Sequence, residues 1–135
     1  MALWIDDSTT GRYDGAEYMR DGDIVINSTG TGTLGRVGIY RSSDNPTGIP
    51  LVPDSHVTVV RIAEQIDPTY VFFCLKAMQP ELEELGEGST NQKELKPLTV
   101  QQIRVPIPPA KEQSTIADTI AELYASLQNM EKNLN

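Results

Sequence analysis

Residues 22–41 read GDIVINSTGTGTLGRVGIYR, and this stretch predicts two strands joined by a glycine-rich turn. The apolar run at residues 24–26 is typical of a buried strand, and Val37 and Ile39 alternate with polar neighbours, as in a half-buried strand. Glycine and threonine dominate the residues between them, which favours a hairpin-like return of the chain.

The turn at residues 30–35 also contains G-x-G-x-x-G, the pattern of dinucleotide-binding loops. Such a loop needs a helix that opens at the third glycine, because the helix N-terminus holds the pyrophosphate. Here the residues after Gly35 predict a strand, and the chain has no G-K-[ST] motif. We therefore expect a glycine-threonine turn, which can approach a phosphate backbone closely, with Arg36 as its anion contact.

The middle of the chain predicts a further strand and an interrupted helix. Residues 56–62, HVTVVRI, are rich in β-branched residues, and Asp67 and Pro68 supply a helix cap and a first-turn proline. Pro80 must kink or restart this helix. Residues 103–108, IRVPIP, are expected to be extended at a sheet edge. The fold class is α+β: a small, twisted, β-rich domain with a helix pair, followed by a long C-terminal helix.

The final helix has the clearest periodicity in the chain. Apolar residues recur at alternating spacings of four and three, which is the heptad pattern of a coiled coil. This seam favours a partner helix, from a second copy or another subunit, because a lone surface helix needs a wider apolar stripe. The alternative is a helix packed on its own domain. We divide the chain into a mixed domain, 1–109, and a dimerisation helix, 110–135. The seam comprises Ile116, Ile120, Leu123, Leu127, Met130 and Leu134.

Composition limits the partners of the chain. The net charge is −8, which argues against casual nucleic-acid binding because an acidic surface repels phosphates. Residues 27–41 and 88–104 are the least acidic stretches, so the local pattern still permits DNA binding. A single cysteine, no N-terminal signal peptide and no long apolar run lead us to expect a soluble cytoplasmic protein without membrane contact.

Catalytic and metal motifs are sparse. Asp54, Glu94 and Lys96 imitate a P-D…(D/E)-x-K nuclease pattern, in which two carboxylates bind Mg²⁺, and this stays an alternative. The chain has one histidine and one cysteine, and its residues include neither C-x-x-C nor H-E-x-x-H. We expect no catalytic residues, no metal and no cofactor.

A second polar loop, GSTNQKEL at residues 88–95, follows the middle helix. Asparagine and glutamine can pair with adenine edges, and lysine with guanine or phosphate. The alternative is an ordinary polar loop that caps the next turn.

Four stretches together resemble the specificity (S) subunits of type I restriction–modification systems. The first is MRDGDIVINSTGTGTLGRVGIY, the second IDPTYVFFCLKA, the third GSTNQKEL and the fourth IRVPIPPAKEQSTIA. Their order and spacing make the resemblance specific, although Asn91 stands one place ahead of the usual glutamine of the third motif. Family members have a longer segment before the GDI strand, so the resemblance implies an N-terminally short half-subunit or a fragment.

The resemblance implies a target recognition domain that reads half of a split site in double-stranded DNA. Its spacer helix forms a coiled coil with a second one, and methylation (M) and restriction (R) subunits supply the catalysis. The alternative is a dimerisation or regulatory fragment that binds S or M subunits and no DNA. The expected DNA-facing residues are Ser28, Thr29, Thr31, Thr33 and Arg36 in the first loop, and Thr90, Asn91, Gln92 and Lys93 in the second.

Overall fold

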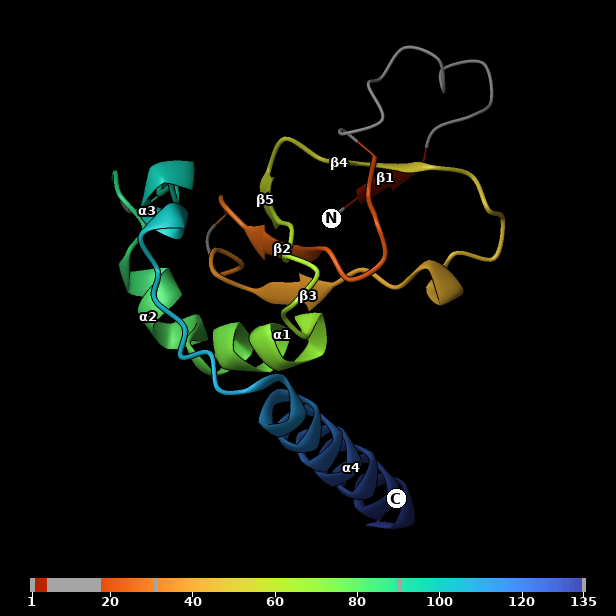
Figure 1. The fold of residues 1–135 in the computed structure, drawn as a ribbon. Helices are drawn as coiled ribbons and strands as arrows, with labels where there is room; N and C mark the ends of the chain where they lie inside the picture. The colour runs from red at the N-terminus through yellow and green to blue at the C-terminus, as the bar shows by residue number, and fades with distance from the viewer. Residues whose placement is uncertain (1, 5–17, 31, 90, 135) are drawn as a thin grey trace.

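The computed structural model describes residues 2–4, 18–30, 32–89 and 91–134, and Figure 1 shows the α+β fold that the sequence predicts. Within these described residues, five strands precede four helices, and a 3-10 turn, Ser42–Asp44, lies between β3 and β4. The strands are β1 (Ala2–Trp4), β2 (Ile24–Asn27), β3 (Val37–Ile39), β4 (Leu51–Pro53) and β5 (Val57–Val60). The helices are α1 (Pro68–Ala77), α2 (Gln79–Glu84), α3 (Pro97–Gln101) and α4 (Ala110–Leu134).

The predicted hairpin is formed by β2 and β3, which are antiparallel. β2 is the central strand of the order β3-β2-β5, and Ile24 pairs with Ile39 on one side and Val60 on the other. A second sheet joins β1 to β4. Gly35 ends the turn with a φ of +88°, and a Cβ there would lie 3.0 Å from the backbone nitrogen of Glu83. Glycine is therefore required at this position, both for the turn and for the close approach of α2.

The hydrophobic core lies between the three-stranded sheet and the helices. Ile24 and Ile26 are fully buried on one face of β2, as the alternation of a strand requires. They cluster with Leu75 of α1, with Leu82 of α2 and with Leu95 beyond it. Burying a leucine side chain contributes roughly 2 kcal/mol, so these contacts fix the two middle helices against the sheet.

The middle helices begin as the sequence predicts. The Asp67 carboxylate accepts a hydrogen bond from the backbone nitrogen of Thr69 at 2.9 Å, and Pro68 occupies the first turn. Helix α1 ends at Ala77, and α2 begins at Gln79 with Pro80 in its first turn, so the proline restarts the helix. The five-residue helix α3 was not predicted, because the polar loop and Pro97 gave no apolar periodicity.

The predicted edge segment, residues 103–108, pairs with neither sheet of the described structure, so that assignment was wrong. Side chains hold it instead: the Tyr70 hydroxyl donates to the Pro106 carbonyl, and the Gln113 amide donates to the Pro108 carbonyl, both at 2.7 Å. The neighbouring Cys74 thiol and burial raise the pKa of Tyr70 to about 12, which keeps the phenol protonated as a donor.

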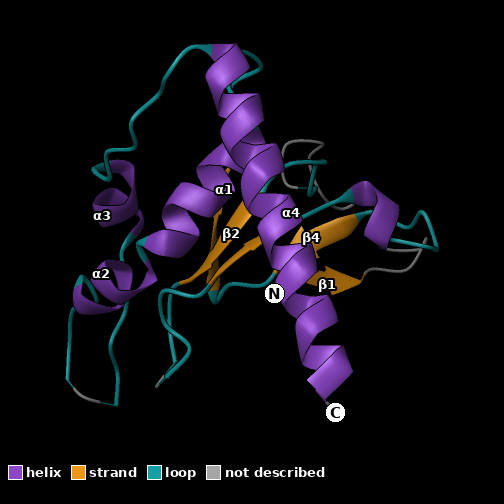
Figure 2. Ribbon diagram, turned by 90° about the horizontal axis from the view of Figure 1, so that it is seen from below, coloured by secondary structure: helices purple, strands orange, loops and turns teal. Residues whose placement is uncertain are grey.

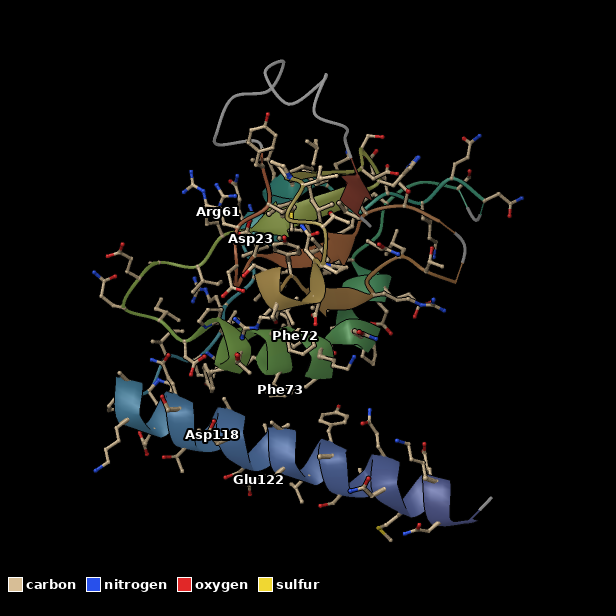
Figure 3. The ribbon with its side chains drawn as sticks, turned by 90° about the vertical axis from the view of Figure 1, so that its right-hand side faces the viewer. Asp23, Arg61, Phe72, Phe73, Asp118 and Glu122 are labelled. Atoms are coloured by element: carbon tan, nitrogen blue, oxygen red, sulfur yellow. The ribbon has the colours of Figure 1, made fainter. Side chains whose placement is uncertain are left out.

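Helix α4 begins at Ala110 and forms the outermost layer of the molecule. Figure 3 shows the sheet, α1 and α4 in successive layers. Ala117 is 3% exposed against the core, and the Tyr124 ring stacks on Phe73 of α1 with 5.8 Å between centroids. The buried Gln113 also accepts a hydrogen bond from the Asp67 backbone nitrogen, which joins the start of α4 to the start of α1.

Candidate nucleic-acid interface

The fold brings the two predicted DNA-facing loops together into one surface, which we call the two-loop surface (residues 28–36 and 88–94). Leu95 donates its backbone hydrogen bond to the Ser28 carbonyl at 2.7 Å, and Thr29 forms an isolated β-bridge with Glu94. In Figure 2 both loops leave the molecule at the end where α2 lies. Two segments far apart in the sequence therefore share one surface.

In the first loop, hydroxyl groups mostly serve the fold. Ser28 is buried, and its hydroxyl lies 2.6 Å from that of Thr58 on β5. The Thr29 hydroxyl lies 3.0 Å from His56 Nδ1, and the Thr33 hydroxyl donates to the Thr29 carbonyl at 3.2 Å. Ser28 thus anchors the loop to the sheet, and the Thr29 and Thr33 side chains brace it from within.

Arg36, at the base of the first loop, is exposed and forms no ion pair with any described residue. Thr31 and Thr90, which we also expected to face DNA, lie outside the described residues. Of the first loop, Arg36 is therefore the side chain best placed to contact an anion.

The second loop presents its polar side chains outward. Asn91, Gln92 and Lys93 are exposed, and no side-chain hydrogen bond or ion pair joins them to another described residue. Gly88 has a φ of +118°, and a Cβ there would lie 2.6 Å from the Gln92 carbonyl oxygen, so only glycine allows this tight loop. A constrained backbone therefore carries three unengaged polar groups, which suits a binding surface.

The charge of this surface is mixed. Lys96 pairs with Glu87 at 3.0 Å, and that contact raises the pKa of Lys96. Lys93 and Arg36 keep their charge uncompensated by any described ion pair, while Glu94 is exposed nearby. Two available cations are therefore present on a chain whose net charge is −8.

Two residues of the nuclease alternative make other contacts in the structure, and the alternative itself stays a prediction. The Asp54 carboxylate accepts a hydrogen bond from the His56 backbone nitrogen at 2.9 Å, which lowers the pKa of Asp54, and Lys96 is engaged by Glu87. Within the described part of the chain, no three or more His, Cys, Asp or Glu residues are grouped so that they could hold a metal ion.

A partly buried ion pair at the ends of β2 and β5 was missed at the level of sequence. Asp23, 2% exposed, accepts hydrogen bonds from Arg61 Nε at 3.0 Å and Arg61 Nη2 at 2.8 Å, and from the Arg20 backbone nitrogen at 2.9 Å. Figure 3 labels both side chains of the pair. Asp23 precedes β2 and Arg61 follows β5, so the pair joins the ends of two neighbouring strands. The sequence signals that could have predicted the pair were the acid directly before β2 and the arginine directly after β5.

The heptad seam of α4 lies beside, and separate from, the stripe that packs on α1. Leu123, Leu127 and Met130 are 59%, 56% and 61% exposed, while Ala117 and Tyr124 face α1. Ile120 is half-buried at the boundary between the two stripes. The structure therefore bears out packing of the helix on its own domain, and Leu123, Leu127 and Met130 of the seam stay exposed. The side chain of Leu134 lies beyond those that the structure describes.

Comparison with protein families identifies the class to which the chain belongs. The model of the type I restriction modification DNA specificity domain matches residues 7–135. The chain therefore belongs to this family, as its four motifs predicted, and takes part in DNA sequence recognition by type I restriction–modification complexes. Specificity domains of this family are generally not catalytic. No curated protein gave a significant match.

None of the helices in the described residues combines the length and hydrophobicity that a membrane crossing requires.

Proposed function

We propose that this chain is a specificity subunit, or half-subunit, that reads double-stranded DNA with the two-loop surface while it binds methyltransferase and restriction subunits. The observation that carries this proposal is the side-by-side placement of the two loops through Ser28 and Leu95. The exposed, unengaged side chains of Asn91, Gln92 and Lys93 lie on that surface. A cytoplasmic location is part of this proposal, and the family match supports it.

Each exposed group has a role that its chemistry suits. Arg36 and Lys93 contact phosphates and position the domain, since such contacts carry no sequence information. Asn91 and Gln92 read base edges, because a carboxamide can pair bidentately with adenine in the major groove. Thr29 and Thr33 brace the first loop, and Ser28 anchors it to β5. In this proposal, Arg36 and Lys93 supply affinity, and Asn91 and Gln92 supply sequence specificity.

The seam of α4 supplies the second part of the proposal. Two chains pair through Leu123, Leu127 and Met130 in a coiled coil, because these side chains are exposed at heptad spacing. In the half-subunit, this dimer places two copies of the recognition domain, residues 1–109, at a distance set by the helices, residues 110–135. A C2 pair of that kind would read two half-sites.

The proposal predicts salt-dependent DNA binding by the chain in complex with its methyltransferase partner. The logarithm of the binding constant should fall linearly with the logarithm of the salt concentration, with a slope of roughly 0.9 for each phosphate contact. Arg36→Gln should lower the magnitude of that slope by about the value for one phosphate contact. It should also weaken binding to all DNA sequences equally. The control is Lys111→Gln, since Lys111 is exposed on α4, outside the two-loop surface, and has no ion pair among the described residues. Fluorescence anisotropy at several salt concentrations measures both.

The regulatory-fragment alternative makes the opposite prediction. A complex that forms with the methyltransferase but shows no salt-dependent DNA binding would contradict DNA recognition by this chain and favour that alternative.

A further inference from the structure

A surface hollow of about 450 Å³ lies beside the first loop, where that loop meets the junction of α1 and α2. Its wall combines residues of the first loop with residues of α1 and α2, which lie outside the two-loop surface. The residues of its wall that matter here are Gly32, Gly35, Arg36, Lys76, Gln79 and Glu83.

The wall of the hollow is held in place by the fold. Gln79 Oε1 accepts a hydrogen bond from the Val37 backbone nitrogen at 3.1 Å, which ties the start of α2 to β3. Gly35 packs so closely on α2 that a Cβ would lie 3.0 Å from the Glu83 nitrogen. These two contacts fix the base of Arg36 relative to α1 and α2.

Two cations from different elements line the hollow. Lys76 Nζ lies 5.5 Å from the centroid of the Phe72 ring, and this cation–π contact orients the ammonium without neutralising it. Neither Lys76 nor Arg36 forms an ion pair with a described residue. Glu83 is the one acid among the described residues of the wall, so these residues give the hollow a net positive charge.

The loop side of the hollow is open to an approaching backbone. A Cβ built on Gly32 would meet no atom within 4 Å, so this side has room for a ligand as well as for the loop. A phosphodiester carries one negative charge and contacts such a wall through its non-bridging oxygens. Arginine and lysine together suit that ligand, because both donate charge-assisted hydrogen bonds to phosphate oxygens.

We propose that this hollow binds a backbone phosphate of the recognised DNA, with Lys76 as a phosphate contact beside Arg36. The proposal rests on the DNA-reading function above and extends the interface from the loops onto α1. Because the contact is to the backbone, Lys76 supplies affinity and register and does not distinguish bases.

The test uses the complex with the methyltransferase partner and two variants that should change DNA affinity in opposite directions. Lys76→Gln should lower the salt slope of DNA binding by roughly one contact and weaken specific and non-specific DNA alike. Glu83→Gln should strengthen binding at low salt, because it removes the acid that opposes the phosphate. Lys76→Arg keeps the charge and should keep the slope. The control is Lys111→Gln on α4, exposed and without an ion pair among described residues.

The outcomes separate this proposal from the function on which it rests. A wild-type complex that binds no DNA overturns the proposed function. A wild-type complex that binds DNA, with Lys76→Gln and Glu83→Gln both leaving affinity and slope unchanged, overturns the phosphate contact alone. A third measurement, calorimetric titration of the complex with inorganic phosphate, distinguishes a free-anion site from a DNA phosphate contact. Tight phosphate binding that Lys76→Gln abolishes, with an unchanged DNA slope, would show a free-anion site and contradict the proposal.

Discussion

Leu127→Glu is expected to convert a homodimer of this chain into a monomer. Leu127 lies in the exposed seam of α4 and is 56% exposed in the single chain, so a partner helix would have to cover it. Each dimer of the variant would bury two unpaired carboxylates between the helices, which costs about 3 kcal/mol or more. Light scattering coupled to size-exclusion chromatography measures the mass directly.

The variant should leave the fold intact. The stripe that packs on α1, through Ala117 and Tyr124, is separate from the seam, and glutamate is a good helix former. Ala125→Glu is the matched control: it adds the same charge two residues away, about 200° around the helix, at an exposed position. A wild-type chain that is monomeric at all concentrations, or a Leu127→Glu variant that stays dimeric, would contradict the seam as a dimer interface.

Arg61→Met is expected to destabilise the fold by about 2–3 kcal/mol, because it leaves the buried Asp23 carboxylate without its main partner. The Arg61 guanidinium donates two hydrogen bonds to Asp23, and these bonds raise the pKa of Arg61. We place the effect below that of a fully buried pair for two reasons. The Arg61 side chain is 35% exposed, and Asp23 keeps its hydrogen bond from the Arg20 backbone.

Urea unfolding followed by circular dichroism measures this change. Arg104→Met is the control, and it should shift the free energy of unfolding by less than about 0.5 kcal/mol, as exposed substitutions usually do. Adding Asp23→Asn to Arg61→Met should recover part of the loss, since the buried charge is then gone. Equal stability of Arg61→Met and wild type would show that the ion pair does not hold β2 to β5.

The sequence predicted those features that local chemistry determines. Strands β2 and β3 follow from the apolar run at residues 24–26 and from the glycine turn that joins them. The start of α1 follows from Asp67 and Pro68, and the break before α2 follows from Pro80. Each of these signals acts over a few residues, so it can be read without knowledge of the tertiary structure.

Other features depend on contacts between distant residues, and the sequence did not reveal them. The two loops meet because Leu95 bonds to Ser28, and the Asp23–Arg61 pair spans 38 residues. Residues 103–108 looked like an edge strand, but the Tyr70 hydroxyl holds their backbone in place of a sheet partner. The heptad periodicity of α4 was clear, whereas the second stripe that binds α1 depends on Ala117 and Tyr124 meeting a helix far away in the chain.

Selection from a pool of randomised double-stranded DNA tests the central claim most directly. The chain, in complex with its methyltransferase partner, should enrich one motif, and Gln92→Ala should relax the preference at one position of that motif by about 1–3 kcal/mol. Wild-type affinity for the motif should exceed that for random DNA at the same salt concentration. A pool that stays random after selection, with a complex that is folded and bound to its partner, would contradict sequence recognition by the two-loop surface.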